Sequence, residues 1–377
     1  MMSRTPLQQA LGAAPGSPSP AAEADYCGAT SAARFGDPQA EFSALLEGGA
    51  VYDLGFRARI SLAGGDRMRW MNGMVTNNIR DLAAARGVYA FLLNPQGRIL
   101  GDLDVYNLGE SLVVETDCSQ VEKILATFDH YIIMDDVVIT RLGQHMTSLG
   151  VAGPKSRAVL EAAGMKVPEL QPLEVFTAKC DCECGCLECS VVRGDHPRHE
   201  SYEIWIAPHD VLKLWQALVA AGAKPVGWET LELDRIVSGV PRYGIDLRER
   251  DLPQETGQDR ALNFNKGCYV GQEIVERIRS RGAVHRKFSG FLLDRAVAIP
   301  AGTKIVSGEK EVGEITSAAS IALDAGQKTV ALGYIRREAG VPGREVDVGG
   351  EKATIVPMPV SDGLLSGKRD SLQQRLA

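Results

Sequence analysis

The stretch VYAFLLNPQGRILGDLDVY, residues 88–106, has the pattern of two β-strands joined by a tight turn. VYAFLL (88–93) is rich in strand-forming residues, and RILGDLDVY (98–106) returns as its partner. Between them, NPQG (94–97) places Pro and Gly where a β-turn accepts them. The stretch therefore predicts a β-hairpin, and the elements on either side of it decide the fold.

Strands and helices alternate around this hairpin. They are a strand at 57–62, a helix over 66–74, a strand at 111–116, a helix carrying Val121, Ile124, Leu125 and Phe128, and a strand at 136–142. Ser119 and Glu122 match the capping box that begins a helix. The β-α-β-β-α-β order with one added strand predicts a ferredoxin-like layer.

The same order recurs further along the chain. It consists of strands at 145–153, 175–180, 189–193 and 202–207, a helix from Pro154 to about Gly164, and an amphipathic helix from Asp210 to Ala221. The first-helix starts, Asp66 and Pro154, differ by 88 positions, and the second-helix starts, Ser119 and Asp210, differ by 91. We interpret the two halves as diverged copies of one unit.

The two ends of the chain have other patterns. From about Lys287, short strands separated by Gly-containing turns are typical of an all-β barrel or sandwich. Residues 13–25 are rich in Pro, Ala and Ser and predict a flexible loop, with regular structure beginning near Val51. The predicted fold class is α+β. Its parts are a partly flexible N-terminal segment (1–50), two tandem ferredoxin-like units (about 51–143 and 144–240), a further segment (241–286), a C-terminal β-barrel (287–360) and a loose tail (361–377).

Composition and charge exclude several classes of protein. The net charge of −7 argues against general nucleic-acid binding. No apolar run approaches the roughly 20 residues of a membrane span. The first residues lack the features of a secretory signal or transit peptide, so we expect a cytoplasmic protein with reduced or metal-bound cysteines. We also expect a monomer.

Five of the eight cysteines lie in KCDCECGCLEC, residues 179–189. They are Cys180, Cys182, Cys184, Cys186 and Cys189. Clustered thiols favour metal binding, and strand alternation would place the first three on one face. The spacing is not the usual pair of Cys-x-x-Cys motifs, so an accessory hairpin is the alternative. We assign no metal ligand.

Another cysteine, Cys268, lies in a segment unlike the rest of this acidic chain, NFNKGCYVGQEIVERIRSRGAVHRK (263–287). Cys268 precedes a predicted helix, where the helix dipole and Lys266 would favour a thiolate. From 266 to 287, six Lys or Arg outnumber two Glu, so this basic patch should attract an anionic ligand. Composition alone, however, favours a small buried Cys in such a position.

The string KGCYVGQE (266–273) resembles the signature of the YgfZ family. These are folate-binding proteins tied to iron–sulfur cluster maintenance, and they belong with the aminomethyltransferase T-proteins of glycine cleavage. Weaker matches include SGVPRYGIDLRERDLPQE (238–255), the strand around Glu203, and LNPQGRILGDLDVY (93–106). The resemblance covers nearly the whole chain.

The resemblance implies an aminomethyltransferase-type module that binds tetrahydrofolate, or a one-carbon derivative, between the ferredoxin-like units and the barrel. Cys268 and Asp102 are the expected catalytic residues. Glu203 would accept hydrogen bonds from the pterin edge, and Arg235 would satisfy its carbonyl or stack on the ring. The other expected cofactor contacts are Lys266, Gln272, the ring of Tyr269, and the basic patch for the glutamate tail.

Departures from the T-protein pattern bear on activity. Where the T-protein has two adjacent Asp, this chain has Gly101-Asp102, and where the T-protein has Thr-Asn-Asp, this chain ends the segment with Asn78. The T-protein, in turn, lacks the signature cysteine. A family Glu is also replaced by Val237. We therefore expect an accessory protein whose partners are iron–sulfur enzymes or assembly proteins. Two alternatives stay open: a folate-dependent aminomethyltransferase or other one-carbon transferase, and a metal-binding scaffold built on the cysteine cluster.

Overall fold

The computed structural model describes residues 3–13, 19–182, 185–282, 284–323, 326–361 and 363. The chain divides into two compact units. The sheet unit comprises 1–95, 100–231 and 260–272, and the barrel unit comprises 96–99, 232–259 and 273–377. Among the described residues, no helix combines the length and apolar character needed to cross a membrane.

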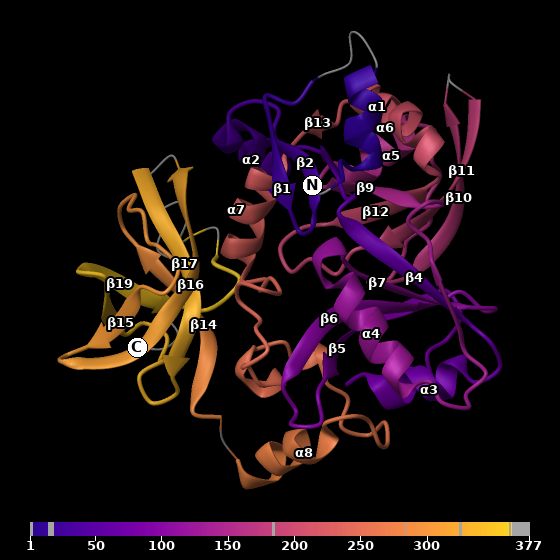
Figure 1. The fold of residues 1–377 in the computed structure, drawn as a ribbon. Helices are drawn as coiled ribbons and strands as arrows, with labels where there is room; N and C mark the ends of the chain where they lie inside the picture. The colour runs from indigo at the N-terminus through magenta and orange to yellow at the C-terminus, as the bar shows by residue number, and fades with distance from the viewer. Residues whose placement is uncertain are drawn as a thin grey trace. The chain divides into compact units, whose positions relative to one another are not determined.

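The first sheet of the sheet unit has the strand order β5-β6-β7-β4-β8. Figure 1 labels β4, β5, β6 and β7 of this sheet. The bounds are β4 Arg57–Ala63, β5 Arg86–Leu93, β6 Ile99–Asn107, β7 Leu112–Asp117 and β8 Val138–Arg141. α3 (Arg67–Met74) and α4 (Val121–Tyr131) bury their apolar side chains, among them Trp70 and Phe128, against one face. β5 and β6 are the hairpin predicted at 88–106.

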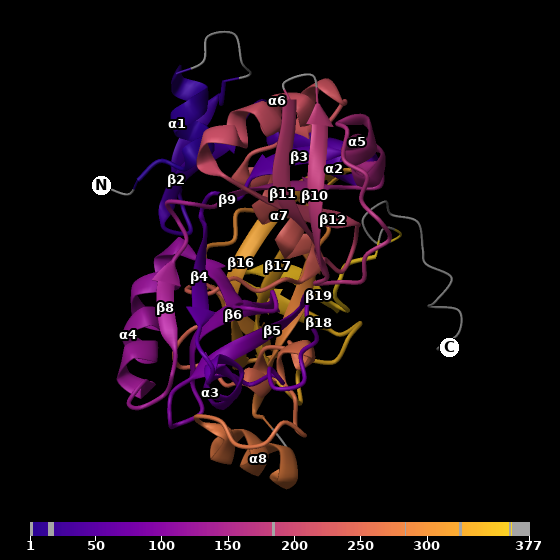
Figure 2. The same ribbon diagram turned by 90° about the vertical axis from the view of Figure 1, so that its right-hand side faces the viewer.

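The second sheet has the order β10-β11-β12-β9-β3-β13. Figure 2 labels β3, β9, β10, β11 and β12 of this sheet. The bounds are β3 Ala50–Asp53, β9 Thr147–Ala152, β10 Val175–Cys182, β11 Gly185–Arg193, β12 Ser201–Ile206 and β13 Lys224–Pro225. Its helices are α5 (Ser156–Ala162) and α6 (Val211–Ala220). Strand for strand, this order repeats that of the first sheet once β3 is set aside, because β3 is inserted between β9 and β13.

The two sheets pack together through the faces that α3, α4, α5 and α6 leave uncovered. The ring of Tyr106 on β6 meets Trp205 on β12 edge to face, with 5.1 Å between ring centroids. Val113, Val175 and Val192 are buried in the same cluster. Polar side chains on these two faces are therefore largely withdrawn from water.

The N-terminal segment is more ordered than the sequence predicted. Its elements are α1 Pro6–Ala13, β1 Ala22–Tyr26, β2 Ala29–Arg34 and α2 Pro38–Glu47. The flexible loop predicted at 13–25 is wrong for residues 22–25, and residues 14–18 lie outside the described part of the chain. Cys27 and Gly28 have φ of 49° and 94°, as a two-residue hairpin turn of this kind requires. β1 lacks apolar alternation because its anchor is a single residue, Tyr26, which stacks on Trp228 at 5.0 Å.

Asp53, at the end of β3, ties this segment to the sheet unit. Its buried carboxylate accepts hydrogen bonds from the hydroxyls of Thr5 and Ser31 and from the backbone N–H of Gly55. Burial raises the pKa of Asp53, and these donors oppose that shift. The carboxylate therefore depends on residues up to 48 positions away in the chain.

The capping box predicted at Ser119 and Glu122 is wrong. A 3-10 turn over Cys118–Gln120 leads into α4, and no side chain caps the helix. The N–H of Ser119 donates instead to the carbonyl of Cys27 at 2.9 Å. Glu122 pairs with Arg141. The tip of the β1–β2 hairpin thus takes the place of the expected cap.

The barrel unit holds a closed barrel in the order β14-β17-β16-β15-β18-β19. The bounds are β14 Arg286–Leu293, β15 Lys304–Ser307, β16 Lys310–Leu323, β17 Gly326–Arg336, β18 Glu345–Val348 and β19 Glu351–Val356. The remaining helices are α7 Trp228–Ser238 and α8 Gln272–Arg281. This confirms the predicted α+β fold class with a C-terminal barrel. The predicted tail lies almost entirely outside the described residues.

Candidate functional site

Arg57 on β4 is the centre of an ion cluster between the two sheets. Its guanidinium binds three carboxylates, with N–O distances of 2.8 Å to Glu115, 2.9 Å to Asp117 and 3.0 Å to Asp104. These carboxylates come from the neighbouring strands β6 and β7. We call this group, together with Arg59 and Glu203, the sheet cluster.

Within the sheet cluster, Arg59 connects Glu115 to Glu203. It lies two residues after Arg57 on the same strand face, and its side chain is 1% exposed. Its Nη2 contacts Glu115 at 3.1 Å and also pairs with Glu203 on β12. Glu203 accepts a further hydrogen bond from the indole N–H of Trp205 at 2.9 Å. The residue predicted to bind a pterin edge is thus already held by two protein donors.

Asp102 lies beside the sheet cluster, two residues before Asp104 on β6. Its carboxylate accepts hydrogen bonds from the Tyr89 hydroxyl at 2.8 Å and from the Gln120 amide at 2.9 Å. Burial raises the pKa of Asp102, and the charge of Asp117 adds to this shift. A Cβ at Gly101 would lie 3.0 Å from the Gln120 amide oxygen, so the space next to Asp102 suits glycine.

The sheet cluster contains more acidic than basic groups. Its two guanidinium groups contact the carboxylates of Asp104, Glu115, Asp117 and Glu203. Burial raises the pKa of Asp104 to about 7 despite the opposing charge of Arg57. Burial also acts to raise the pKa of Glu115, but the charges of Arg59 and Arg57 outweigh it and lower the pKa of that carboxyl. Asp104 is therefore the member suited to exchange a proton near neutral pH.

Lys266 fixes the KGCY turn to α3. Its side chain is buried, and its Nζ donates to the carbonyls of Asn72 and Val75, the latter at 2.8 Å. These are carbonyls that the end of a helix leaves unsatisfied, and a cation there also interacts favourably with the helix dipole. Burial, and then the charge of Arg80, lowers the pKa of Lys266 to about 8. The ammonium of Lys266 therefore supports the turn, and its predicted contact with the cofactor stays a prediction.

Cys268 is exposed on this fixed turn. The ring of Tyr269 lies 4.7 Å from the Lys266 Nζ, and its backbone N–H bonds to the Gln272 side chain at 3.0 Å. Gln272 thus closes the turn at the start of α8. Among the predicted site residues, the structure brings Lys266, Cys268, Tyr269 and Gln272 together. It brings Asp102 and Glu203 together around the sheet cluster.

Arg235 lies in the barrel unit and uses all five of its N–H donors. Its acceptors are the two carboxylate oxygens of Glu232, the Asp246 carboxylate, the Val240 carbonyl and the Ser317 hydroxyl. It lines a cavity of about 470 Å³ that also has apolar walls, including Ile245 and Ile299. Because its N–H groups already have acceptors, Arg235 has none left to donate to a pterin carbonyl.

The predicted basic patch is partly neutralised within the barrel unit. Arg286 contacts Asp251 at 2.7 Å and Glu255 at 3.0 Å. Arg279 lies 3.5 Å from Glu276 on the same helix. These pairs leave less net positive charge than the residue count suggested.

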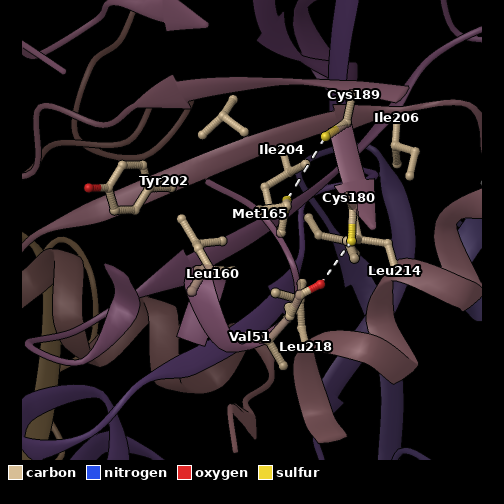
Figure 3. Packing of buried hydrophobic residues seen from close by; sticks show 14 of the residues in the cluster. Val51, Leu160, Met165, Cys180, Cys189, Tyr202, Ile204, Ile206, Leu214 and Leu218 are labelled. Atoms are coloured by element: carbon tan, nitrogen blue, oxygen red, sulfur yellow. Dashed lines mark hydrogen bonds between the residues drawn. The ribbon is translucent and has the colours of Figure 1, made fainter. Parts of the chain in front are cut away.

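The described cysteines of the 179–189 cluster do not form one thiolate site. Cys180 and Cys189 are buried in the core of the second sheet, where Figure 3 shows them beside Met165, Ile204 and Leu214. Cys180 donates to the carbonyl of Ala163 at 3.0 Å, and burial raises the pKa of Cys189 to about 12. Cys186 is exposed and pairs in register with Asp181, on the other hairpin face. The side chains of Cys182 and Cys184 lie outside the described part of the chain.

Comparison with known proteins identifies the family. Residues 21–266 match the GCVT N-terminal domain, and residues 286–362 match the glycine cleavage T-protein C-terminal barrel domain. The chain belongs to the glycine cleavage T-protein (GcvT) family. An aminomethyltransferase of Streptomyces coelicolor is 26% identical over 351 residues, covering 89% of this chain and 92% of that protein. A putative chloroplastic transferase of Arabidopsis thaliana is 25% identical over 323 residues, covering 85% and 73%.

A solved structure agrees on the fold of this GcvT-family chain. The crystal structure of glycine cleavage system aminomethyltransferase T from Bartonella henselae superposes with a TM-score of 0.83 at 18% identity, covering 96% of this chain and 99% of that one. Family membership confirms the coarser part of the expected resemblance, that to the T-protein superfamily. The finer resemblance to YgfZ proteins stays a prediction.

Sequence reasoning missed the residues that connect Asp102 to Glu203. Arg57, Asp104 and Glu115 occur on strands that were each predicted, but their meeting depends on cross-strand register, such as Asp104 opposite Glu115. One available signal was the charge alternation in RARISL and GDLDVY. A buried strand face with charges at every second position predicts an ion cluster.

Proposed function

We propose that this chain binds a reduced folate and acts as a YgfZ-like accessory protein for the assembly or repair of iron–sulfur enzymes, with Cys268 as its functional thiol. The observation that carries the proposal is the turn at KGCYVGQE. Lys266 is buried beneath it and bonded to α3, while the thiol two residues later stays exposed. A buried ammonium is costly, so its use to hold one turn supports a functional role for what the turn presents.

The sheet cluster supports folate as the ligand. A reduced pterin presents several N–H groups along one edge, and the cluster has an excess of carboxylate acceptors next to Asp102 and Glu203. When bound, tetrahydrofolate would supply the nitrogen atoms that carry a one-carbon unit. In this proposal, Asp102 and Glu203 hold the pterin edge.

A complementation experiment tests the role of Cys268. A strain that lacks its own protein of this type would receive wild-type chain, Cys268→Ala or Cys186→Ala, and the activities of its iron–sulfur enzymes would be measured. Cys186 is the matched control because it is also exposed. We expect wild type and Cys186→Ala to restore activity and Cys268→Ala to fail. Full restoration by Cys268→Ala would contradict the proposal.

A second candidate function is folate-dependent one-carbon transfer, and one observation favours it. Asp102 and Asp104 provide hydrogen-bonded carboxylates on one strand face, as proton transfer during such a reaction requires. A glycine-cleavage assay with the lipoyl carrier protein and tetrahydrofolate separates the two functions. Turnover that is lost in Asp102→Asn but kept in Cys268→Ala would favour the transferase.

A further inference from the structure

Asp104 faces another carboxylate directly across the first sheet. In the register of β6 and β7 it lies opposite Glu115, and like charges in this position repel each other. Arg57 contacts both carboxylates, at 3.0 Å and 2.8 Å, but it also serves Asp117. Arg59 adds a second guanidinium at Glu115 and also pairs with Glu203, so two guanidinium groups serve four carboxylates and the arrangement favours adding a positive charge.

We propose that Asp104 holds a proton at neutral pH while the sheet cluster is empty, and releases it to solvent when a ligand with an N–H-rich edge binds there. The ligand class is a reduced pteridine, so this inference rests on the proposed folate binding. No bond of the ligand is made or broken in this step. The N–H donors of the ligand take the place of the proton on the Asp104 carboxylate, and that proton passes to the buffer. Asp104 is thus a proton-holding residue that no sequence motif marked.

The groups around Asp104 support this assignment. Arg57 on β4 and the more distant Arg260 favour its charged form, whereas Glu115 on β7 and Asp102 on β6 disfavour it. Tyr106, also on β6, has its own pKa raised by burial and then by the charge of Asp104. Burial outweighs the two cations and leaves the pKa of Asp104 near 7.

The second argument is that the sheet cluster has unused donors. The Nε and Nη1 atoms of Arg59 are buried without a hydrogen-bond partner among the described residues. Arg59 is only 1% exposed, and buried polar groups are normally hydrogen-bonded. A ligand that carries both N–H and carbonyl groups along one edge would complement such a site.

Two measurements test the proposal. Carbon-13 NMR of aspartate-labelled wild-type protein, with Asp104→Asn to assign the signal, follows the titration of Asp104 without any ligand. Should that variant fold poorly, Asp104→Glu removes the signal from the aspartate region equally well. Calorimetry with 5-formyltetrahydrofolate in two buffers of different ionisation heat then counts the protons released on binding. Asp129→Asn, an exposed position on α4, is the control.

We expect Asp104 to titrate near pH 7 and proton release to approach one per ligand below pH 7, then fall toward zero above it. Asp104→Asn should bind without this release, and Asp129→Asn should match wild type. An ordinary titration near pH 4, or unchanged release in Asp104→Asn, would overturn the proposal. Absence of folate binding would instead defeat the proposed function and the release step, whereas the NMR titration alone decides whether Asp104 holds the proton.

Discussion

Two polar networks, one in each unit, use the same residue types with different results. In the barrel unit, every N–H of Arg235 has an acceptor, and the buried Asp246 accepts from the Arg235 guanidinium, the Arg242 backbone and two hydroxyls. In the sheet cluster, carboxylates outnumber guanidinium groups, and Arg59 keeps N–H groups that find no acceptor in the described part of the chain. A fully bonded network can only support the fold, whereas an incomplete one retains capacity for a proton and a ligand. Arg235 and Asp104 therefore belong to different functional categories, although the sequence suggested a ligand role only for Arg235.

The largest expected effect comes from breaking the complete network. Arg235→Ala leaves Asp246 buried without its charge partner, and we expect a loss of about 3–5 kcal/mol in the free energy of unfolding. Urea unfolding of the full chain measures this, with Arg336→Ala at an exposed β17 position as control. A loss under about 1 kcal/mol together with a large fall in folate affinity would reverse our reading of Arg235.

The incomplete network should respond to pH. The folded state keeps the Asp104 proton up to about pH 7, while the unfolded chain releases it near 3.8, so the folded state binds the extra proton between these values. Stability of the wild type should therefore fall as pH rises through this window. Asp104→Asn removes the effect, and its stability relative to wild type should improve by about 3 kcal/mol between pH 4.5 and pH 8. If the difference in the free energy of unfolding between wild type and Asp104→Asn stays the same at all pH values, Asp104 is an ordinary ion-pair member.

Substitution of Lys266 gives a third and smaller test, of how much a buried and hydrogen-bonded ammonium contributes to stability. Lys266→Met leaves the carbonyls of Asn72 and Val75 without their donor, and we expect a loss of about 1–3 kcal/mol. Lys310→Met at an exposed position is the control, measured by thermal unfolding. A variant as stable as the control would mean that the KGCY turn is held by other contacts.

Thiol labelling should show the contrast between buried and exposed groups with almost no effect on stability. Iodoacetamide should modify Cys268 and Cys186 first, because both are exposed. Cys189 should react last, since burial raises its pKa to about 12. Cys268→Ala should remove one fast site, as mass spectrometry of labelled peptides would reveal. Fast labelling of Cys189 in folded protein would contradict its place in the core.

The sequence allowed most of the regular structure to be predicted where local patterns control it. The hairpin at 88–106 and the α6 face of Val211, Leu214, Trp215 and Leu218 carry their own periodicity, and the structure has both. β1 was missed because AEADY has no such pattern and depends on Trp228, about two hundred residues away. Ser119 was assigned as a cap because nothing local revealed that its N–H would meet Cys27.

The candidate site was predictable only in part for the same reason. The family string pointed to Cys268 and its neighbours, and the resemblance pointed to Asp102 and Glu203. The roles of Lys266 and Arg235 depend on how many acceptors surround each side chain, which a linear sequence does not contain. The partners of Arg57 lie 47 to 60 positions away, so this arginine could be recognised as a hub only after the strands had been paired.

The hydrogen bonds to Asp53 have a practical consequence for anyone shortening this chain. Residues 1–50 look dispensable by composition, and a trimmed version starting at 51 would be a natural choice for expression. Such a version would remove the hydroxyls of Thr5 and Ser31 and leave the buried carboxylate with the single N–H of Gly55. It would also cut into β3 and take a strand out of the second sheet. Affinity tags and truncations that spare residues 1–50 keep this carboxylate bonded.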